Sequence, residues 1–150
     1  MARAYRKFVL DTHLFIDAFR DPAANAALQD FHRRYAPFEY LSAVVAQELR
    51  SGIRRPEDRR ALERHVLAVF ERVGRVVVPS VESWHRSGDL LAAMARVDGL
   101  EVGRVTKAFA NDMLLALSCR EAGCVLVTSN VRDFLRIRRH LSFDFTAPWP

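Results

Sequence analysis

The sequence predicts one α/β domain over residues 1–150, folded as a three-layer α/β/α sandwich around a mostly parallel sheet. The chain is long enough to bury a core without disulfides, and half of its residues are apolar. Short apolar runs without polar alternation recur along it, separated by longer stretches in which apolar residues have helical spacing. Such runs predict strands covered on both faces, which are typical of a parallel sheet with helices on each side.

Short apolar runs are the expected strands. They occupy residues 8–10, 40–41, 76–78, 125–127 and 143–145. Gly74 and Pro79 bound the third run, and the fifth is expected at an edge of the sheet. Ligands of such sheets bind beyond the carboxyl ends of the strands, so residues at those ends are the first candidates for a site.

The stretches between these strands carry the signals of helices and of helix boundaries. The expected helices cover residues 14–19, 23–35, 42–49, 56–73, 80–97, 106–122 and 130–139. Pro22 follows the end of the first, Ser42 is placed to cap the third, and Pro56 begins the fourth. Asn130 is expected to cap the last helix, and residues 98–104 are expected to form a loop.

The composition limits the compartment and the partners. No apolar run approaches the ~20 residues of a membrane span, and the apolar residues after the basic start are too few for a signal peptide. We therefore expect a cytoplasmic protein without membrane association. The net charge of +5 favours a polyanion, nucleic acid first, although an acidic protein partner would suit it too. Cys119 and Cys124 lack metal-site spacing and are expected to be reduced core thiols.

Acidic residues stand where a parallel sheet places a site. Asp11 follows the first expected strand, Glu48 lies on the helix after the second, Asp112 lies in the helix 106–122, and Asp133 follows the fourth strand. A carboxylate directed toward a core is costly, and converging carboxylates repel one another. A divalent cation relieves both problems, and a set of oxygen ligands favours Mg²⁺ or Mn²⁺. Such a site suits nuclease chemistry on an RNA backbone.

Each acid also has a purely structural interpretation. Asp11 is placed to cap the helix that follows it, and Glu48 to lie on a solvated helix face. Asp112 is a candidate for an exposed first-turn acid that the helix dipole favours. Asp133 stands at the capping-box position relative to Asn130.

Four short motifs, in order, extend over essentially the whole chain. They are Phe8-Val9-Leu10-Asp11-Thr12, Ser42 with Glu48-Leu49, Asn111-Asp112 with Leu114-Leu115-Ala116, and residues 127–134, and the chain closes with Ala147-Pro148-Trp149-Pro150. Each motif alone is weak, but together they resemble the PIN-domain family, and within it the VapC-type toxins of VapBC toxin–antitoxin pairs.

That resemblance implies a PIN-like α/β/α sandwich and a metal-dependent endoribonuclease that acts as the toxin of a type II toxin–antitoxin pair. The implied catalytic and metal-binding acids are Asp11, Glu48, Asp112 and Asp133, with Mg²⁺ or Mn²⁺ as the ion. Asp11 and Asp112 are the expected direct ligands, Glu48 acts partly through water, and either Asp133 or Asn130 completes the site. The implied supporting residues are Thr12, Thr128 and Asn130, and the hydroxyl of Thr128 is expected to hold the metal's water or a carboxylate.

The resemblance also implies a homodimer, an RNA substrate and a cognate VapB-like antitoxin whose tail blocks the acidic groove. His13 departs from the family pattern, which most often has asparagine there, and is either a phosphate contact or a plain polar neighbour. Two groups of arginines are candidates for RNA phosphate contacts, with a solvated surface role as the alternative. They are Arg54, Arg55, Arg59 and Arg60, and Arg132, Arg136, Arg138 and Arg139.

Other α/β classes lack their own residues in this sequence. A response-regulator receiver needs paired acids near its first strand and a lysine after its last, but Asp11 has no acidic neighbour and no lysine follows Lys107. A haloacid-dehalogenase-like phosphatase needs a second aspartate where the chain has His13, and no G-x-x-x-x-G-K P-loop occurs. The remaining alternative is a catalytically inactive PIN-like module that binds RNA or protein, against which the intact set of acids argues.

Overall fold

The structure, a computed structural model, describes residues 6–150 and contains a five-stranded sheet in the order β3-β2-β1-β4-β5. All of the strand pairings are parallel. The strands are β1 (Lys7–Leu10), β2 (Glu39–Ser42), β3 (Val76–Val77), β4 (Cys124–Val127) and β5 (Phe145–Thr146). The expected parallel α/β class is confirmed, and the last strand lies at an edge, beginning two residues and ending one residue later than expected.

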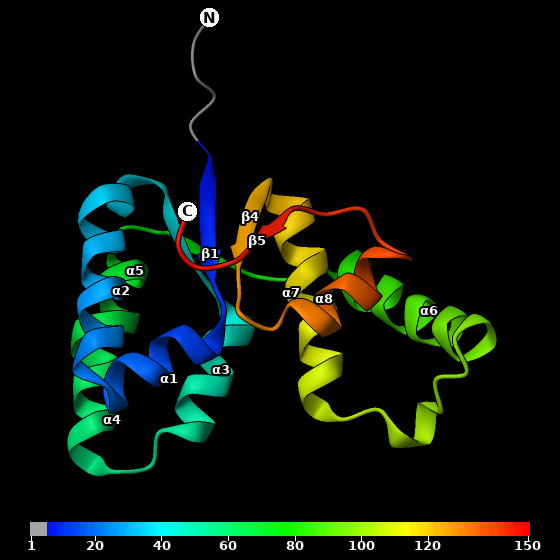
Figure 1. Cartoon of the computed structure of the whole chain (residues 1–150), viewed down its shortest axis with the longest axis horizontal. Coiled ribbons are helices and arrows are strands. Elements are labelled where there is room, and N and C mark those ends of the chain that lie inside the picture. The colour runs from blue at the N-terminus through cyan, green and yellow to red at the C-terminus, as the bar shows by residue number, and fades with distance from the viewer. Residues whose placement is uncertain (1–5) are drawn as a thin grey trace, which may run out of the picture.

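The order of the strands creates a switch in winding at the centre of the sheet. From β1 the chain moves outward through β2 to β3, and it then returns to place β4 and β5 on the other side of β1 (Figure 1). Leu10 pairs with Val127, so β1 and β4 end at the same level. Asp11 and Thr128, the next residues, therefore leave the sheet side by side. Open α/β sheets bind their ligands at such a switch point.

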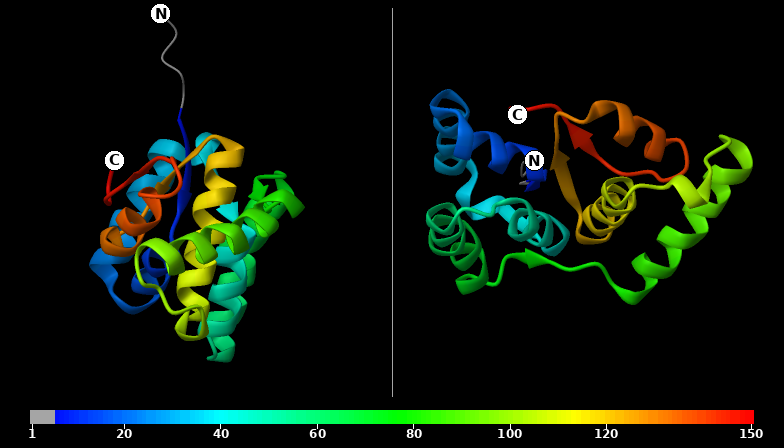
Figure 2. Two further views of the ribbon diagram at one scale, coloured as in Figure 1. Left: turned by 90° about the vertical axis from the view of Figure 1, so that its right-hand side faces the viewer. Right: turned by 90° about the horizontal axis from the view of Figure 1, so that it is seen from below.

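Helices cover the sheet on both sides (Figure 1). They are α1 (Thr12–Arg20), α2 (Pro22–Tyr35), α3 (Ala43–Gly52), α4 (Pro56–Leu62), α5 (Ala68–Arg72), α6 (Val81–Val97), α7 (Lys107–Ala122) and α8 (Val131–Arg138). Helices α1, α2, α4 and α5 lie on one side, and α6, α7 and α8 on the other, with α6 outside α7 (Figure 2). Helix α3 packs against α1 and α7. This arrangement confirms the three-layer sandwich.

Helix α7 is the central helix of its layer. It begins at the N-cap Thr106, whose side chain accepts a hydrogen bond from the main-chain N–H of Phe109, and it ends at Gly123 in the left-handed region. Nearly every residue from Phe109 to Cys119 is buried, so this helix is surrounded on all sides. A polar side chain in this stretch of α7 therefore faces other elements rather than bulk solvent.

The expected helix 56–73 contains an irregularity that the apolar pattern does not predict. Between α4 and α5 lies a π-helical segment, Glu63–Leu67. Leu62 and Leu67 are both fully buried, yet an α-helix would rotate residues five apart by about 140°. The wider π turn brings both leucines to the core. Two 3-10 segments, Ala36–Phe38 and Val102–Arg104, complete the structure, and the second lies in the expected loop.

Two further expectations concern burial. Cys119 and Cys124 are free and buried, as expected of core thiols. In the part of the chain that the structure describes, no helix has the length and apolar character to cross a membrane.

Candidate active site

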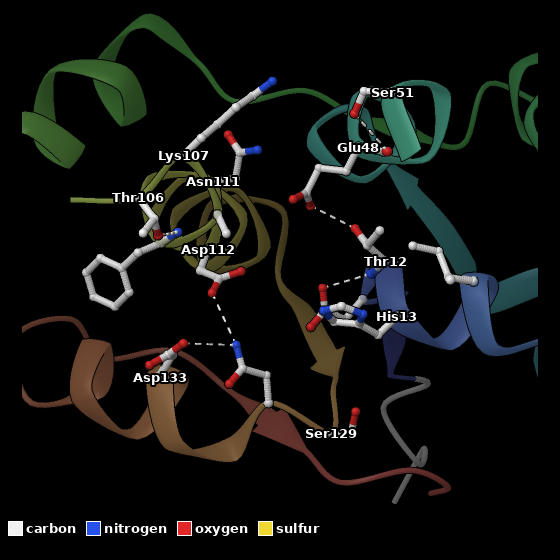
Figure 3. A pocket seen from close by; sticks show the side chains of 15 residues that line it. Thr12, His13, Glu48, Ser51, Thr106, Lys107, Asn111, Asp112, Ser129 and Asp133 are labelled. Atoms are coloured by element: carbon white, nitrogen blue, oxygen red, sulfur yellow. Dashed lines mark hydrogen bonds between the residues drawn. The ribbon is translucent and has the colours of Figure 1, made fainter. Parts of the chain in front are cut away.

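A cavity of about 630 Å³ lies at the carboxyl end of the sheet, beside the ends of β1 and β4. All four predicted acids line it, each from a different element: Asp11 from the end of β1, Glu48 from α3, Asp112 from α7 and Asp133 from α8. Figure 3 shows Asp112 and Asp133 on one side and Glu48, Thr12 and His13 on the other. The structure thus brings together residues that lie up to 122 positions apart in the sequence.

Asp11 is held rigidly at the end of β1. Its main-chain N–H donates to the carbonyl oxygen of Val127 at 2.9 Å, which continues the β1–β4 pairing by one residue. Its carboxylate accepts from the N–H of Thr12 at 2.8 Å and from the hydroxyl of Thr128 at 2.6 Å. Asp11 is also the N-cap of α1, so it has the expected capping role and lines the cavity as well.

Thr12 connects Asp11 to Glu48. Its main-chain N–H donates to Asp11, and its buried hydroxyl donates to the Oε1 atom of Glu48 at 2.7 Å. Glu48 is therefore oriented across the cavity and is half-buried, which contradicts its interpretation as a solvated helix residue. The first turn of α1 and the middle of α3 are joined by this contact.

Asp112 lies in the second turn of α7 and is 9% exposed, so its interpretation as an exposed first-turn acid is wrong. Burial, and after it the nearby charges of Asp11, Glu48 and Asp133, together raise the pKa of this carboxyl to about 8. In the protein chain alone, Asp112 is therefore largely protonated at neutral pH.

Asn130 corrects two expectations at the start of α8. It stands at the N-cap, but its side chain makes no capping hydrogen bond. Its amide nitrogen instead donates to the Oδ2 atoms of Asp112 and Asp133, at 3.3 Å in each case (Figure 3). The main-chain N–H of Asn130 donates to the Oγ1 atom of Thr128 at 3.0 Å, so Asp133 does not form a capping box with it.

The four carboxylates have no cationic partner within residues 6–150: none of the ion pairs there includes them. They are held by neutral donors, the hydroxyls of two threonines, one main-chain N–H and one amide. Oxygen donors without cationic partners are the set that Mg²⁺ and Mn²⁺ prefer. However, the described residues contain no three His, Cys, Asp or Glu side chains that already meet as one metal-binding group. The donor chemistry fits a divalent cation, but the acids stand around the cavity rather than at a single point.

The cavity walls also contain side chains that were not among the predicted catalytic, metal-binding or supporting residues. Lys107, in the first turn of α7, and His13 are cationic or titratable side chains on its walls. Asn111 is buried, and its amide donates to the side-chain oxygen of Gln47 at 3.4 Å, which joins α7 to α3. Asn111 and Gln47 each directly precede a site acid in the sequence, which is the only signal that pointed to them.

None of the eight arginines considered for phosphate contacts lines the cavity. The guanidinium of Arg136 lies 5.2 Å from the ring centre of Phe109, which lines the cavity, but Arg136 itself is not a lining residue. Arg55 lies beside Glu57 and Asp58 at the start of α4, in ion pairs that favour the solvated surface role for this residue.

Comparisons with known proteins agree with the fold described above. Similar solved structures include DNA-bound VapBC from Salmonella typhimurium, with 23% identity over 95% of this chain and 98% of that chain and a TM-score of 0.70. FitAcB from Neisseria gonorrhoeae has 19% identity over 95% and 98% of the two chains and a TM-score of 0.67. VapBC-1 from nontypeable Haemophilus influenzae has 22% identity over 93% and 96% and a TM-score of 0.61. At these identities the likeness establishes the fold.

A search of curated proteins finds no match to this chain. The family model described as PIN domain matches residues 8–140, a range that includes β1 to β4, helix α8 and all four acids of the cavity. Because that match covers most of the sequence and the structure has the corresponding fold, the chain belongs to the PIN domain family.

Proposed function

We propose that the protein is a Mg²⁺- or Mn²⁺-dependent endoribonuclease and the toxin of a type II toxin–antitoxin pair. The observation that carries this proposal is the convergence of four carboxylates without cationic partners on one cavity, at the winding switch of a PIN domain. Burying acids without cationic partners lowers the stability of a fold. Four such acids around one cavity therefore indicate a functional site.

The residues of the chain divide into those that bind the ion and those that position them. Asp11 and Asp112 are the direct ligands in this proposal, with Glu48 acting partly through water and Asp133 completing the set. Thr12 and Thr128 fix the carboxylates of Glu48 and Asp11 by hydrogen bonds of 2.7 and 2.6 Å. A bound divalent cation would supply the positive charge that stabilises the phosphodiester as it reacts. Asp112 must release its proton for this role.

The RNA strand needs positive groups around an acidic cavity. Lys107 and His13, on the cavity walls, are placed to contact phosphates beside the scissile one. The net charge of +5 favours the approach of RNA over the rest of the surface. We place this activity in the cytoplasm.

A VapB-like antitoxin and a second copy of the chain are the proposed protein partners. VapBC complexes are among the structures that this chain resembles over nearly its whole length. In addition, Val78, Val81 and Trp84 are between 57% and 70% exposed near the start of α6, and exposed apolar residues that gather in this way suit a protein interface.

The proposal is tested by incubating total RNA with the purified protein, free of antitoxin, in the presence of Mg²⁺ or Mn²⁺. We expect fragments that disappear with EDTA and with Asp112→Asn, and that persist with Asp89→Asn, which removes an exposed acid of α6 far from the cavity residues. If folded protein cleaves no RNA under any of these conditions, the inactive PIN-like binding module becomes the better description.

A further inference from the structure

The side chain of Asn130 has an unusual position for a residue at a helix start. An N-cap asparagine ordinarily accepts a hydrogen bond from the first turn of its helix with its side-chain oxygen. In this protein that bond is not made, and the amide nitrogen points to Asp112 and Asp133. The Asn130 side chain therefore lacks the usual capping bond, and its amide group donates to two acids of the cavity instead.

The two sides of the cavity are held in different ways. Asp11 and Glu48 accept hydrogen bonds of 2.6 to 2.8 Å from Thr12 and Thr128. Within residues 6–150, the only side-chain donor to Asp112 or Asp133 is the Asn130 amide, and both of these contacts are 3.3 Å long. Optimal N–H···O distances are about 2.9 to 3.0 Å, so the amide is shared between the two acids and binds neither tightly.

The amide contacts two acids that influence each other. The charge of Asp133 opposes ionisation of Asp112, and the partial positive charge of an –NH₂ group between them reduces that repulsion without neutralising it. The main chain of Asn130 is anchored separately, through its N–H to Thr128. A rotation of the side chain alone would therefore free both acids while the loop stays in place.

We propose that the Asn130 amide bridges Asp112 and Asp133 in the place of a divalent cation, and that the cation binds by displacing it. This inference rests on the proposed function, because it requires a cation at the cavity. It assigns the fourth position to Asp133 as a ligand and makes Asn130 a competitor of the cation rather than a ligand. It also accounts for acids that line the cavity without meeting as a ready metal-binding group.

The sign of an affinity change distinguishes these roles. Mn²⁺ binding to the full chain is measured by isothermal titration calorimetry for the wild type, Asn130→Ala and Ser129→Ala. Ser129 is a matched control because it is the neighbouring residue, lines the same cavity and, in the described chain, makes no side-chain hydrogen bond to the acids. We expect Asn130→Ala to bind Mn²⁺ about three- to tenfold more tightly, since one hydrogen-bonded competitor is removed, and Ser129→Ala to match the wild type.

Weaker binding by Asn130→Ala would identify Asn130 as a ligand and overturn the inference, and unchanged binding would overturn it as well. If the wild type itself binds no Mn²⁺, the metal dependence of the proposed function fails too, so the two failures are distinguishable. Should Asn130→Ala not fold, nuclear magnetic resonance on the wild type provides the test. Mg²⁺ should make the side-chain amide protons of Asn130 exchange faster with water, and protons that stay protected would refute displacement.

Discussion

Replacement of Asp112 with asparagine tests the electrostatics of the cavity in the absence of metal. The pKa of Asp112 is about 8 in the folded chain, against 3.8 for the ordinary side chain. Between these values the folded protein binds a proton that the unfolded protein has released, so the free energy of unfolding of the wild type falls as the pH rises. The slope is about 1.4 kcal/mol per pH unit for this one group.

From pH 5 to pH 8 this slope amounts to about 4 kcal/mol. Because Asp112 borders a water-accessible cavity, we expect at least about half of that to be measured. Asparagine keeps the shape of the side chain and has no proton to bind. The free energy of unfolding of Asp112→Asn, relative to that of the wild type, should therefore rise by about 2 to 4 kcal/mol over this range.

Urea unfolding followed by circular dichroism, in EDTA and at several pH values, measures this difference directly. Subtraction of the wild-type value at each pH cancels the groups that the two proteins share. Asp89→Asn, at an exposed position of α6, should follow the wild type. A difference between Asp112→Asn and the wild type that stays flat from pH 5 to pH 8 would refute the buried, repelled carboxyl described above.

Three other predictions concern the supports of the fold and site. Thr128→Val removes the hydroxyl that donates to Asp11 and accepts from the main-chain N–H of Asn130. The free energy of unfolding should therefore fall by about 1 to 3 kcal/mol, and a loss smaller than the error of urea titrations would contradict these two bonds. The side chain of Glu39 is 2% exposed, and within residues 6–150 its only hydrogen bond is to the ring of His32, at 2.5 Å. His32→Ala should lower the free energy of unfolding by about 3 kcal/mol in the same assay, whereas the exposed His85→Ala should leave it almost unchanged. Both cysteines are buried, and burial raises the pKa of their thiols, so Ellman's reagent should react with them only after unfolding; rapid reaction of the native protein would show that they are accessible.

Glu39 illustrates a feature that sequence patterns do not detect. It lies at the amino end of β2, opposite the active-site edge, and nothing in the local sequence distinguishes it from an exposed acid before a strand. In the structure it pairs with the last turn of α2, and its other carboxylate oxygen is buried without a hydrogen-bond partner in the described residues. An unpaired buried oxygen is costly, which is why removal of His32 should be felt strongly.

The sequence by itself determined those elements that depend on residues adjacent along the chain. Apolar runs placed β1 and β4, and cap chemistry placed the start of α3 at Ser42, whose side chain accepts a hydrogen bond from the N–H of Val44. The four acids could be selected in the same way, because they follow strands or interrupt apolar helix faces. Periodicity and capping are local properties, so one sequence is enough to show them.

What the acids do in the site was decided by tertiary structure alone. The hydrogen bond of Thr128 to Asp11 joins residues 117 positions apart, and it exists because β1 and β4 are neighbours in register. Asp112 has its raised pKa first because the surrounding elements bury it on the central helix α7, and second because three of them bring carboxylates near it. Asn130 had to be expected as a cap from its local sequence, but its amide instead donates to Asp133 in the first turn of α8 and to Asp112 on α7. Electrostatic and hydrogen-bond partners depend on distances in space, and strand order, which the local pattern does not specify, sets those distances.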